Sequence, residues 1–316
     1  MQNFIFSLNA TFPIFLVMLL GYILKNVHML GEDFVTTANT LNFKVTLPVL
    51  LFLDISTANI RDVWDGSYVL FCSGVTTLCF FTIWGLSKLL IKKKELIGAF
   101  VQASFRSSAA VLGIAFIQNM YGSSGMAPLM IVGTVPLYNI YSVLVLTFEA
   151  RRDDEEIDTS RLTSAIKNII TNPIILGILA GLVVSVSGIT FPVMVNKTLS
   201  SIASLATPLA LIALGAGFEG KGALSKIKPT MVASFIKLLL QPAIILPFAI
   251  ICGFEQEKLV AILIMLASPT TVSCYIMAKN MNNDGTLTSS IIVMTTFLSA
   301  FTLTAWIYLL RSIGLI

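Results

Sequence analysis

FVQASFRSSAAVLGIAFIQNMYG, which runs from Phe100 to Gly122, reads as the interior of a membrane helix except for one residue, Arg106. A helix needs roughly 20 apolar residues to cross the hydrocarbon layer, which is about 30 Å thick. Arg106 follows Glu95, the last charge before this stretch, by eleven residues and would therefore lie roughly 16 Å into that layer. Because an arginine at the bilayer centre costs about 2.5 to 3.5 kcal/mol even on a mild scale, Arg106 is expected to face a water-filled cavity or an anion. The alternative is a structural role, paired with helix carbonyls or with Asp54.

The composition places the rest of the chain in the membrane as well. Of the 316 residues, 56% are hydrophobic and 11% are charged, and the mean hydropathy is +0.90. This leaves too little polar surface to cover a soluble globule. The first apolar segment lacks the pattern of a cleaved signal peptide, so we expect it to be retained. The sequence thus predicts an all-α integral membrane protein, most simply of the bacterial cytoplasmic (cell) membrane.

Polar residues, glycines and prolines divide the chain into ten apolar segments that are long enough to cross. The first to the tenth are residues 4–24, 35–55, 67–90, 97–120, 126–148, 167–187, 196–218, 230–252, 258–279 and 287–310. A closed barrel would show short alternating strands instead, and these runs are continuous.

The basic residues predict the orientation of these segments. If the termini share one face, the connections after odd-numbered segments contain 13 of the 20 basic residues, and those after even-numbered segments contain 4. Cytoplasmic loops are enriched in Lys and Arg, so both termini are expected outside. Loop placement also accounts for the net charge of +4 without a nucleic-acid partner. The other three cations, Lys44, Arg106 and Lys237, fall within segments.

The sequence also shows signs of an internal repeat. Shifts of 160 and 161 residues align the first segment with the sixth, the second with the seventh and the fourth with the ninth. The matched pairs are Pro13 with Pro173, Gly21 with Gly181, Pro48 with Pro208, Asn119 with Asn280 and Met120 with Met281.

This repeat divides the chain into two five-helix halves, residues 1–150 and 166–316, joined by a charged cytoplasmic linker at 151–165 that contains RRDDEEIDTSR. Since five is odd, the second half must be inverted in the membrane relative to the first. Inverted repeats are typical of transporters, whose sites lie near the midplane where interrupted helices meet.

The ninth and fourth segments carry the expected interruptions. In LIMLASPTTVSCYIMAKNM, Pro269 removes a backbone donor, and Ser268, Thr270 and Thr271 supply hydroxyls around the break. The matching part of the fourth segment, 104–113, has no proline, so a break there is inferred from the repeat, the serines and Gly113. A simple proline kink without a transport role is the alternative for the ninth segment.

The charges within the segments predict the sign of the substrate. Lys44, Arg106 and Lys237 stand against one candidate acid, Asp54, near the outer end of its segment. The cavity is therefore expected to be positive and the substrate to be an anion. Individually, Lys44 and Lys237 could equally snorkel or be structural. The shortage of acids argues against a side-chain proton carrier, although a proton could travel on the substrate.

Several function classes are excluded or disfavoured by what the sequence lacks. The one histidine, His28, lies in a polar turn, and the four cysteines lie in apolar segments without metal-type spacing. No cofactor, metal site or enzyme activity is expected, and no nucleotide-binding loop is found. An anion channel would use the same cations, but the repeat and the proline break favour a carrier.

RSSAAVLGIAFIQNMYG resembles the fourth-segment motif of the auxin efflux carrier family, which includes bacterial malate-permease-like members. LPVLLFLDIS, TPLALIALGAGF, ASPTTVSCYIMAKNMNND and MTTFLSAFTLTAWIYLL agree with it in order, so the resemblance covers the whole chain. It implies ten helices in two inverted five-helix repeats, a fold similar to bile-acid symporters and sodium/proton antiporters. The fourth and ninth segments would unwind and cross around Ser107 to Gly113 and Pro269 to Thr271.

The resemblance also implies a scaffold formed by the first, second, sixth and seventh segments, a moving unit formed by the other six, and a homodimer. Where the family often has Asn before the crossover and Pro after its glycine, this chain has Ser107-Ser108 and Ile114. A plant-hormone substrate is therefore not implied.

We therefore expect a secondary or potential-driven transporter of a small organic anion, such as malate or an auxin-like acid, working by alternating access. Arg106 is the candidate for charge recognition. The other candidate substrate-binding residues are Ser107, Ser108, Gly113, Ser268, Pro269, Thr270, Thr271, Asn42, Lys44 and Gln102. The alternatives are an anion channel and a proton- or sodium-coupled carrier of another small solute.

Overall fold

The computed structural model describes residues 2–57, 65–109, 117, 120, 121, 126–150, 167, 170–218 and 220–316. All regular elements in these ranges are helices, without a strand among them. Six of these helices are long and apolar enough to cross a membrane, and two shorter ones, Phe12–Asn26 and Pro173–Ser187, are also apolar. The prediction of an all-α, multi-pass membrane protein is thus confirmed. The predicted linker at 151–165 lies outside the described residues.

The helices follow the predicted segments closely. In chain order they are α1 (Gln2–Asn26), α2 (Glu32–Leu41), η1 (Asn42–Thr46), α3 (Leu47–Ser56), α4 (Gly66–Leu90), η2 (Lys94–Leu96), α5 (Ile97–Phe105), α7 (Ala127–Phe148), α9 (Pro173–Ser187), α10 (Val193–Ser204), α11 (Ala206–Ala216), α12 (Gly220–Ser225), α13 (Ile227–Phe235), η3 (Ile236–Leu240), α14 (Gln241–Ile251), α15 (Gln256–Ala267), α16 (Ser273–Asn280) and α17 (Gly285–Ser312).

Two of the long helices contain a π-helical turn that hydropathy does not predict. η1 joins α2 to α3, and η3 joins α13 to α14, in each case without a break in the helical backbone. Such turns occur mostly as single bulges and often at functional sites, because they rotate the following side chains relative to the preceding ones. Lys44 lies in the first of these turns and Lys237 in the second.

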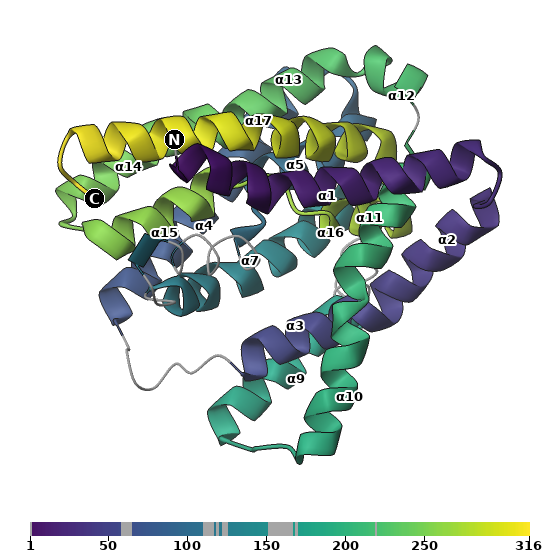
Figure 1. Ribbon diagram of the computed structural model, residues 1–316, viewed down its shortest axis with the longest axis horizontal. Coiled ribbons are helices and arrows are strands. Elements are labelled where there is room, and N and C mark those ends of the chain that lie inside the picture. Colours follow the sequence, from purple (N-terminus) through teal and green to yellow (C-terminus); the bar gives the residue numbers. More distant parts are fainter. Residues whose placement is uncertain are drawn as a thin grey trace.

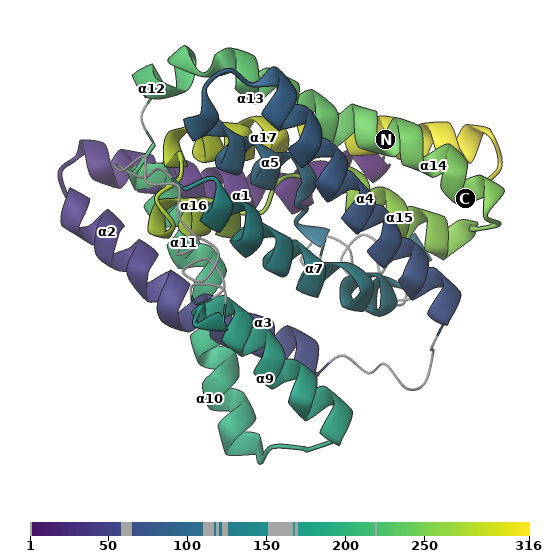
Figure 2. The same cartoon turned by 180° about the vertical axis from the view of Figure 1, so that it is seen from behind.

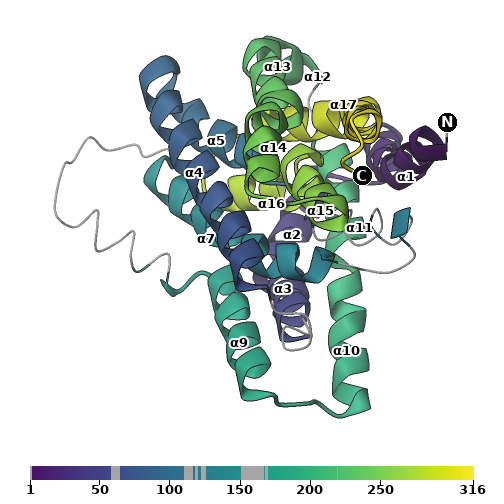
Figure 3. The same cartoon turned by 90° about the vertical axis from the view of Figure 1, so that its left-hand side faces the viewer.

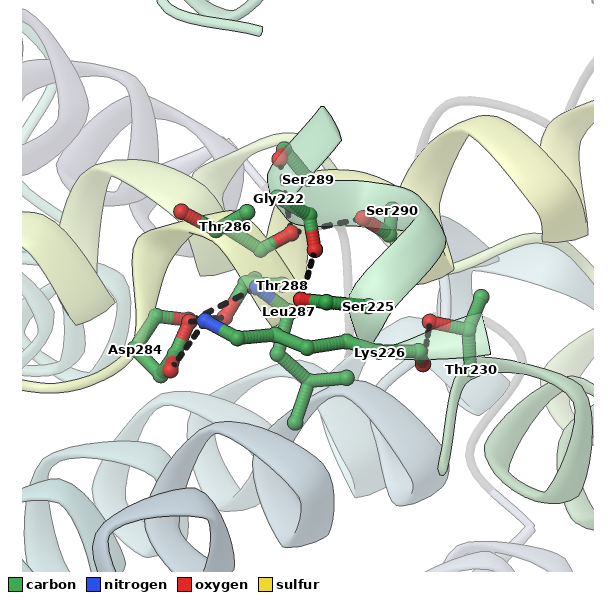
Figure 4. Close-up of polar contacts among 10 residues, drawn as sticks. All are labelled: Gly222, Ser225, Lys226, Thr230, Asp284, Thr286, Leu287, Thr288, Ser289 and Ser290. Atoms are coloured by element: carbon green, nitrogen blue, oxygen red, sulfur yellow. Dashed lines mark hydrogen bonds and ion pairs between the residues drawn. The ribbon is translucent and has the colours of Figure 1, made fainter. Parts of the chain in front are cut away.

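Helix ends are fixed by acidic caps that also form ion pairs. Asp284 caps α17 by accepting from the Leu287 backbone N–H at 2.8 Å, and Lys226 donates to its two carboxylate oxygens at 2.7 and 2.6 Å (Figure 4). Asp65 caps α4 in the same way and pairs with Lys258 at 2.6 Å. The Lys258 hydrogen bond, together with those from Ser67 and Tyr68, holds the pKa of the Asp65 carboxyl well below its usual range.

The broken helices form the centre of the molecule. In α5, α15 and α16 nearly all side chains are buried, whereas α9 and α10 expose large apolar side chains such as Val186 and Met194. Exposed apolar surface of this kind suits contact with lipid tails. Figures 1 and 3 show α3, α9 and α10 extending away from the remaining helices, and Figure 2 shows the same lobe from behind.

Glycines allow close helix contacts both beside this lobe and within it. A Cβ at Gly21 in α1 would collide with the backbone of Ile212 in α11, and a Cβ at Gly181 in α9 would lie 2.9 Å from the Phe52 carbonyl oxygen in α3. Small residues at helix interfaces allow backbones to approach closely in membranes. These contacts pack the first segment on the seventh and the sixth on the second.

Candidate functional site

The site is built where the two interrupted helices meet. α5 ends at Phe105, residues 106–108 are not helical, and α15 and α16 are separated by residues 268–272. The Ser108 backbone N–H donates to the Pro269 carbonyl at 2.9 Å, so the two unwound segments are in direct contact. The breaks expected from the serines and from Pro269 are both present.

Hydroxyl groups from each broken segment satisfy carbonyls at the helix end of the other. Thr270 Oγ1 donates to the Ala103 carbonyl at 2.7 Å, and Ser107 Oγ donates to the Met265 carbonyl, which also accepts from the Tyr138 hydroxyl at 3.0 Å. The last carbonyls of a helix have no partner within it, and lipid supplies none. These contacts explain why the unwound backbone is stable at this depth.

Lys237 donates hydrogen bonds at the C-terminal end of α5. Its side chain is fully buried, and its ammonium donates to the Phe105 carbonyl at 3.3 Å and to Ser107 Oγ. Gln241, one turn further along, donates to the Ser104 carbonyl at 2.7 Å. Because the C-terminal end of a helix carries partial negative charge, a cation is stabilised there. Lys237 is thus held by the crossover backbone.

Arg106 is buried, with 5% of its surface exposed, and its hydrogen-bond partners among the described residues are all neutral. Nη2 donates to Asn139 Oδ1 at 2.7 Å, and Nη1 lies 2.8 Å from Met277 Sδ and 3.4 Å from Ser142 Oγ. No carboxylate pairs with it in the described part of the chain. Pairing with Asp54, one of the alternatives raised above, is therefore not observed. A guanidinium has five N–H donors, so some remain for a ligand.

Arg106 lines a cavity of about 130 Å³ that lies between the crossing segments and the helices that surround them. Its walls come from α1, α3, α7, α11, residues 106–108 and residues 271–273. The polar lining residues are Asp54, Arg106, Ser107, Ser108, Tyr138, Asn139, Thr207, Thr271 and Ser273. Aliphatic side chains such as Leu47 and Ala210 supply most of the remaining surface.

The candidate residues from the sequence differ in whether they line this cavity. Arg106, Ser107, Ser108 and Thr271 line the cavity together. Ser268, Pro269 and Thr270 belong to the crossing but are not among the lining residues. Asn42 in η1 and Gln102 in α5 are buried and do not line the cavity either. Lys44 is exposed and does not line the cavity. Gly113 lies outside the described residues.

Sequence reasoning did not identify Tyr138, Asn139, Thr207 or Ser273. Asn139 follows Pro136 in the apolar run TVPLYNIYS, where an isolated amide is a signal that could have been used. Thr207 and Ser273 carry no such signal, because which face of a helix meets the cavity depends on packing. Within the described residues, no group of His, Cys, Asp and Glu is arranged to hold a metal ion.

Comparisons with known proteins agree along the whole chain. The family model described as membrane transport protein matches residues 6–307. The uncharacterized transporter YfdV of Escherichia coli (strain K12) is 26% identical over 98% of this chain and 99% of its own. An uncharacterized transporter of Methanothermobacter thermautotrophicus is 22% identical over 96% and 98% of the two chains. A putative malonate transporter of Rhizobium meliloti is also 22% identical, over 95% of this chain and 94% of its own.

Proposed function

Because the chain belongs to the membrane transport protein family, as its resemblance to the auxin efflux carriers predicted, we propose that it is a secondary transporter that moves a small organic anion by alternating access. The observation that carries the proposal is Arg106, a buried guanidinium that lines the cavity and has only neutral partners among the described residues. A buried charge is costly unless it is compensated. A bound anion would supply that compensation.

The cavity suits a small substrate. Its volume of about 130 Å³ is below the 300 Å³ or more of typical drug-sized pockets and corresponds to about four water molecules in the liquid. Ser107, Ser108 and Thr271 surround Arg106 with hydroxyl groups that can orient a carboxylate. Together with the malonate assignment of the Rhizobium relative, this favours a short carboxylate such as malonate or malate as the substrate.

We further propose that residues 1–150 and 166–316 are inverted five-helix repeats. Two contacts support this. The first is the contact of Gly21 with Ile212. Its equivalent under the 160-residue shift is a contact of Gly181 with Phe52, and this second contact is also present. The Ser108–Pro269 hydrogen bond joins positions that a shift of 161 makes equivalent. Reciprocal contacts of this kind are what a two-fold relation between the halves requires.

The experiment that tests the function is uptake and counterflow of labelled malonate and malate into proteoliposomes. Arg106→Gln should lower the apparent affinity on the order of ten- to a hundredfold, because a hydrogen bond to a charged group contributes about 1.5 to 3 kcal/mol. Arg311→Gln, which changes an exposed arginine at the end of α17, is the matched control and should transport normally.

Three outcomes would count against the proposal. Absence of carboxylate transport or competition by the wild type would remove the substrate class. Unchanged transport by a folded Arg106→Gln protein would make Arg106 structural. Ion currents far above carrier turnover, without counterflow, would favour the anion channel.

A further inference from the structure

Asp54 lies in the same cavity as Arg106. It is the eighth residue of α3, and its half-buried side chain is part of the cavity lining. Within the described residues, its carboxylate has no hydrogen-bond or ion-pair partner. An unpaired acid within an apolar helix is costly and calls for a functional explanation.

Among the charged groups of the described residues, Arg106 is the cation that shares the cavity with Asp54. The helices α7, α9 and α11 contain no charged residue. The cation of α1, Lys25, pairs with Glu32 at the start of α2, far along the second segment from Asp54. Lys197 on α10 and Lys44 on η1 are both exposed. The same cavity is lined by Arg106 from the crossing segment and by the neutral Tyr138 and Asn139 from α7.

The charge balance of this cavity changes when an anion enters. With the cavity empty, Arg106 and an ionised Asp54 sum to zero. A bound carboxylate adds a second negative charge within the same small volume, and like charges at close range in a poorly solvated site favour protonation of one of them. Uptake of one proton by the Asp54 carboxylate removes one of these negative charges, which restores the balance for a monocarboxylate and leaves one excess negative charge for a dicarboxylate such as malonate. Departure of the anion releases the proton.

We propose that Asp54 is a proton-binding site that couples the anion to one proton. The inference rests on the proposed function and identifies its coupling ion. A monocarboxylate would then cross without net charge movement, whereas a doubly charged dicarboxylate would carry one negative charge. The shortage of acids in the sequence, which argued against a side-chain proton carrier, is offset by the placement of this acid in the same cavity as Arg106.

The test separates coupled uptake from exchange. With the membrane potential clamped at zero, one proton per anion should give about tenfold malonate accumulation per pH unit of inward gradient in wild-type proteoliposomes. Asp54→Asn should lose this accumulation but keep malonate counterflow, because exchange does not require the proton to leave. Asp54→Glu should restore accumulation. Asp33→Asn, the same change at the exposed start of α2, should behave as wild type.

A second measurement does not depend on a substitution. Calorimetric titration of the purified wild type with malonate, in buffers of different ionisation enthalpy and at a pH where malonate is fully ionised, should show uptake of about one proton per bound anion.

The inference is overturned if Asp54→Asn still accumulates malonate, if it loses exchange as well while remaining folded, or if wild-type binding takes up no proton. A wild type that transports neither malonate nor malate would instead refute the proposed function itself.

Discussion

Arg106 and Lys237 are both buried cations, but their surroundings differ. The Lys237 ammonium is directed at the carbonyl end of α5 and at Ser107, so its charge is used within the protein. The Arg106 guanidinium touches one amide oxygen, one hydroxyl and one thioether, and it borders a cavity. The two residues look alike in the sequence, and only their partners distinguish a structural cation from a candidate binding cation.

At this scale, the role of Asn139 can be tested with a double-mutant cycle. Asn139→Ala removes the 2.7 Å bond that orients Arg106, and it should weaken malonate affinity by about tenfold. If Asn139 acts through the arginine, adding this change to Arg106→Gln should cause little further loss. Substrate affinities of the two single variants, the double variant and Asn196→Ala, an exposed control on α10, give the coupling. Additive losses would show that Asn139 acts independently of Arg106.

Among the elements, the breaks in the helices were more predictable than the turns within them. Pro269 and its hydroxyl neighbours indicated the end of α15, and the repeat extended that prediction to residues 104–113. Of these, 106–108 are unwound, and 110–113 lie outside the described residues. The π-turns at Asn42–Thr46 and Ile236–Leu240 could not be predicted, because an extra residue in a helical turn leaves no composition signal. The turns decide which way Lys44 and Lys237 point, so the sequence could not separate an exposed lysine from a buried one.

Helix packing between α1 and α11 gives a prediction at the scale of elements. Gly21→Ala should lower the thermal stability of the protein, because its Cβ would collide with the backbone of α11 and force α1 and α11 apart. Gly74→Ala on α4 is the matched control, since nothing lies within 4 Å of its Cβ. Alanine stabilises a helix interior by roughly 0.5 to 1 kcal/mol relative to glycine, so the control should be neutral or slightly more stable. Thermal unfolding of both variants in the same detergent checks this, and a similar shift in both would contradict the packing argument.

At the scale of the molecule, hydropathy and charge were enough to place the helices but not the cavity. The helix bounds follow the apolar runs to within a few residues, except in the sixth segment, where α9 begins at Pro173. The cavity walls come from α1, α3, α7, α11 and two unwound segments, and no local pattern indicates which faces of these elements meet. Tyr138, Asn139 and Thr207 therefore could not be assembled into one site from the sequence.

The orientation of the whole molecule can be tested by labelling. Lys93 and Ile189 are both exposed and lie in connections that the basic residues assign to opposite faces. In a background with the exposed Cys252 replaced by serine, Lys93→Cys should react with an impermeant maleimide only after the cells are opened. Ile189→Cys should react in intact cells. The reverse pattern would place both termini in the cytoplasm.

The hydrogen bond between Ser108 and Pro269 has a consequence for motion. If the two halves are related by a two-fold axis, two equivalent positions in contact must lie beside that axis. When the halves exchange shapes, a contact between equivalent positions is exchanged with itself and is therefore kept in both states. The two crossing segments would then stay joined throughout the cycle, and a short covalent link between them would leave transport running, whereas the same link at the rim of the cavity would stop it.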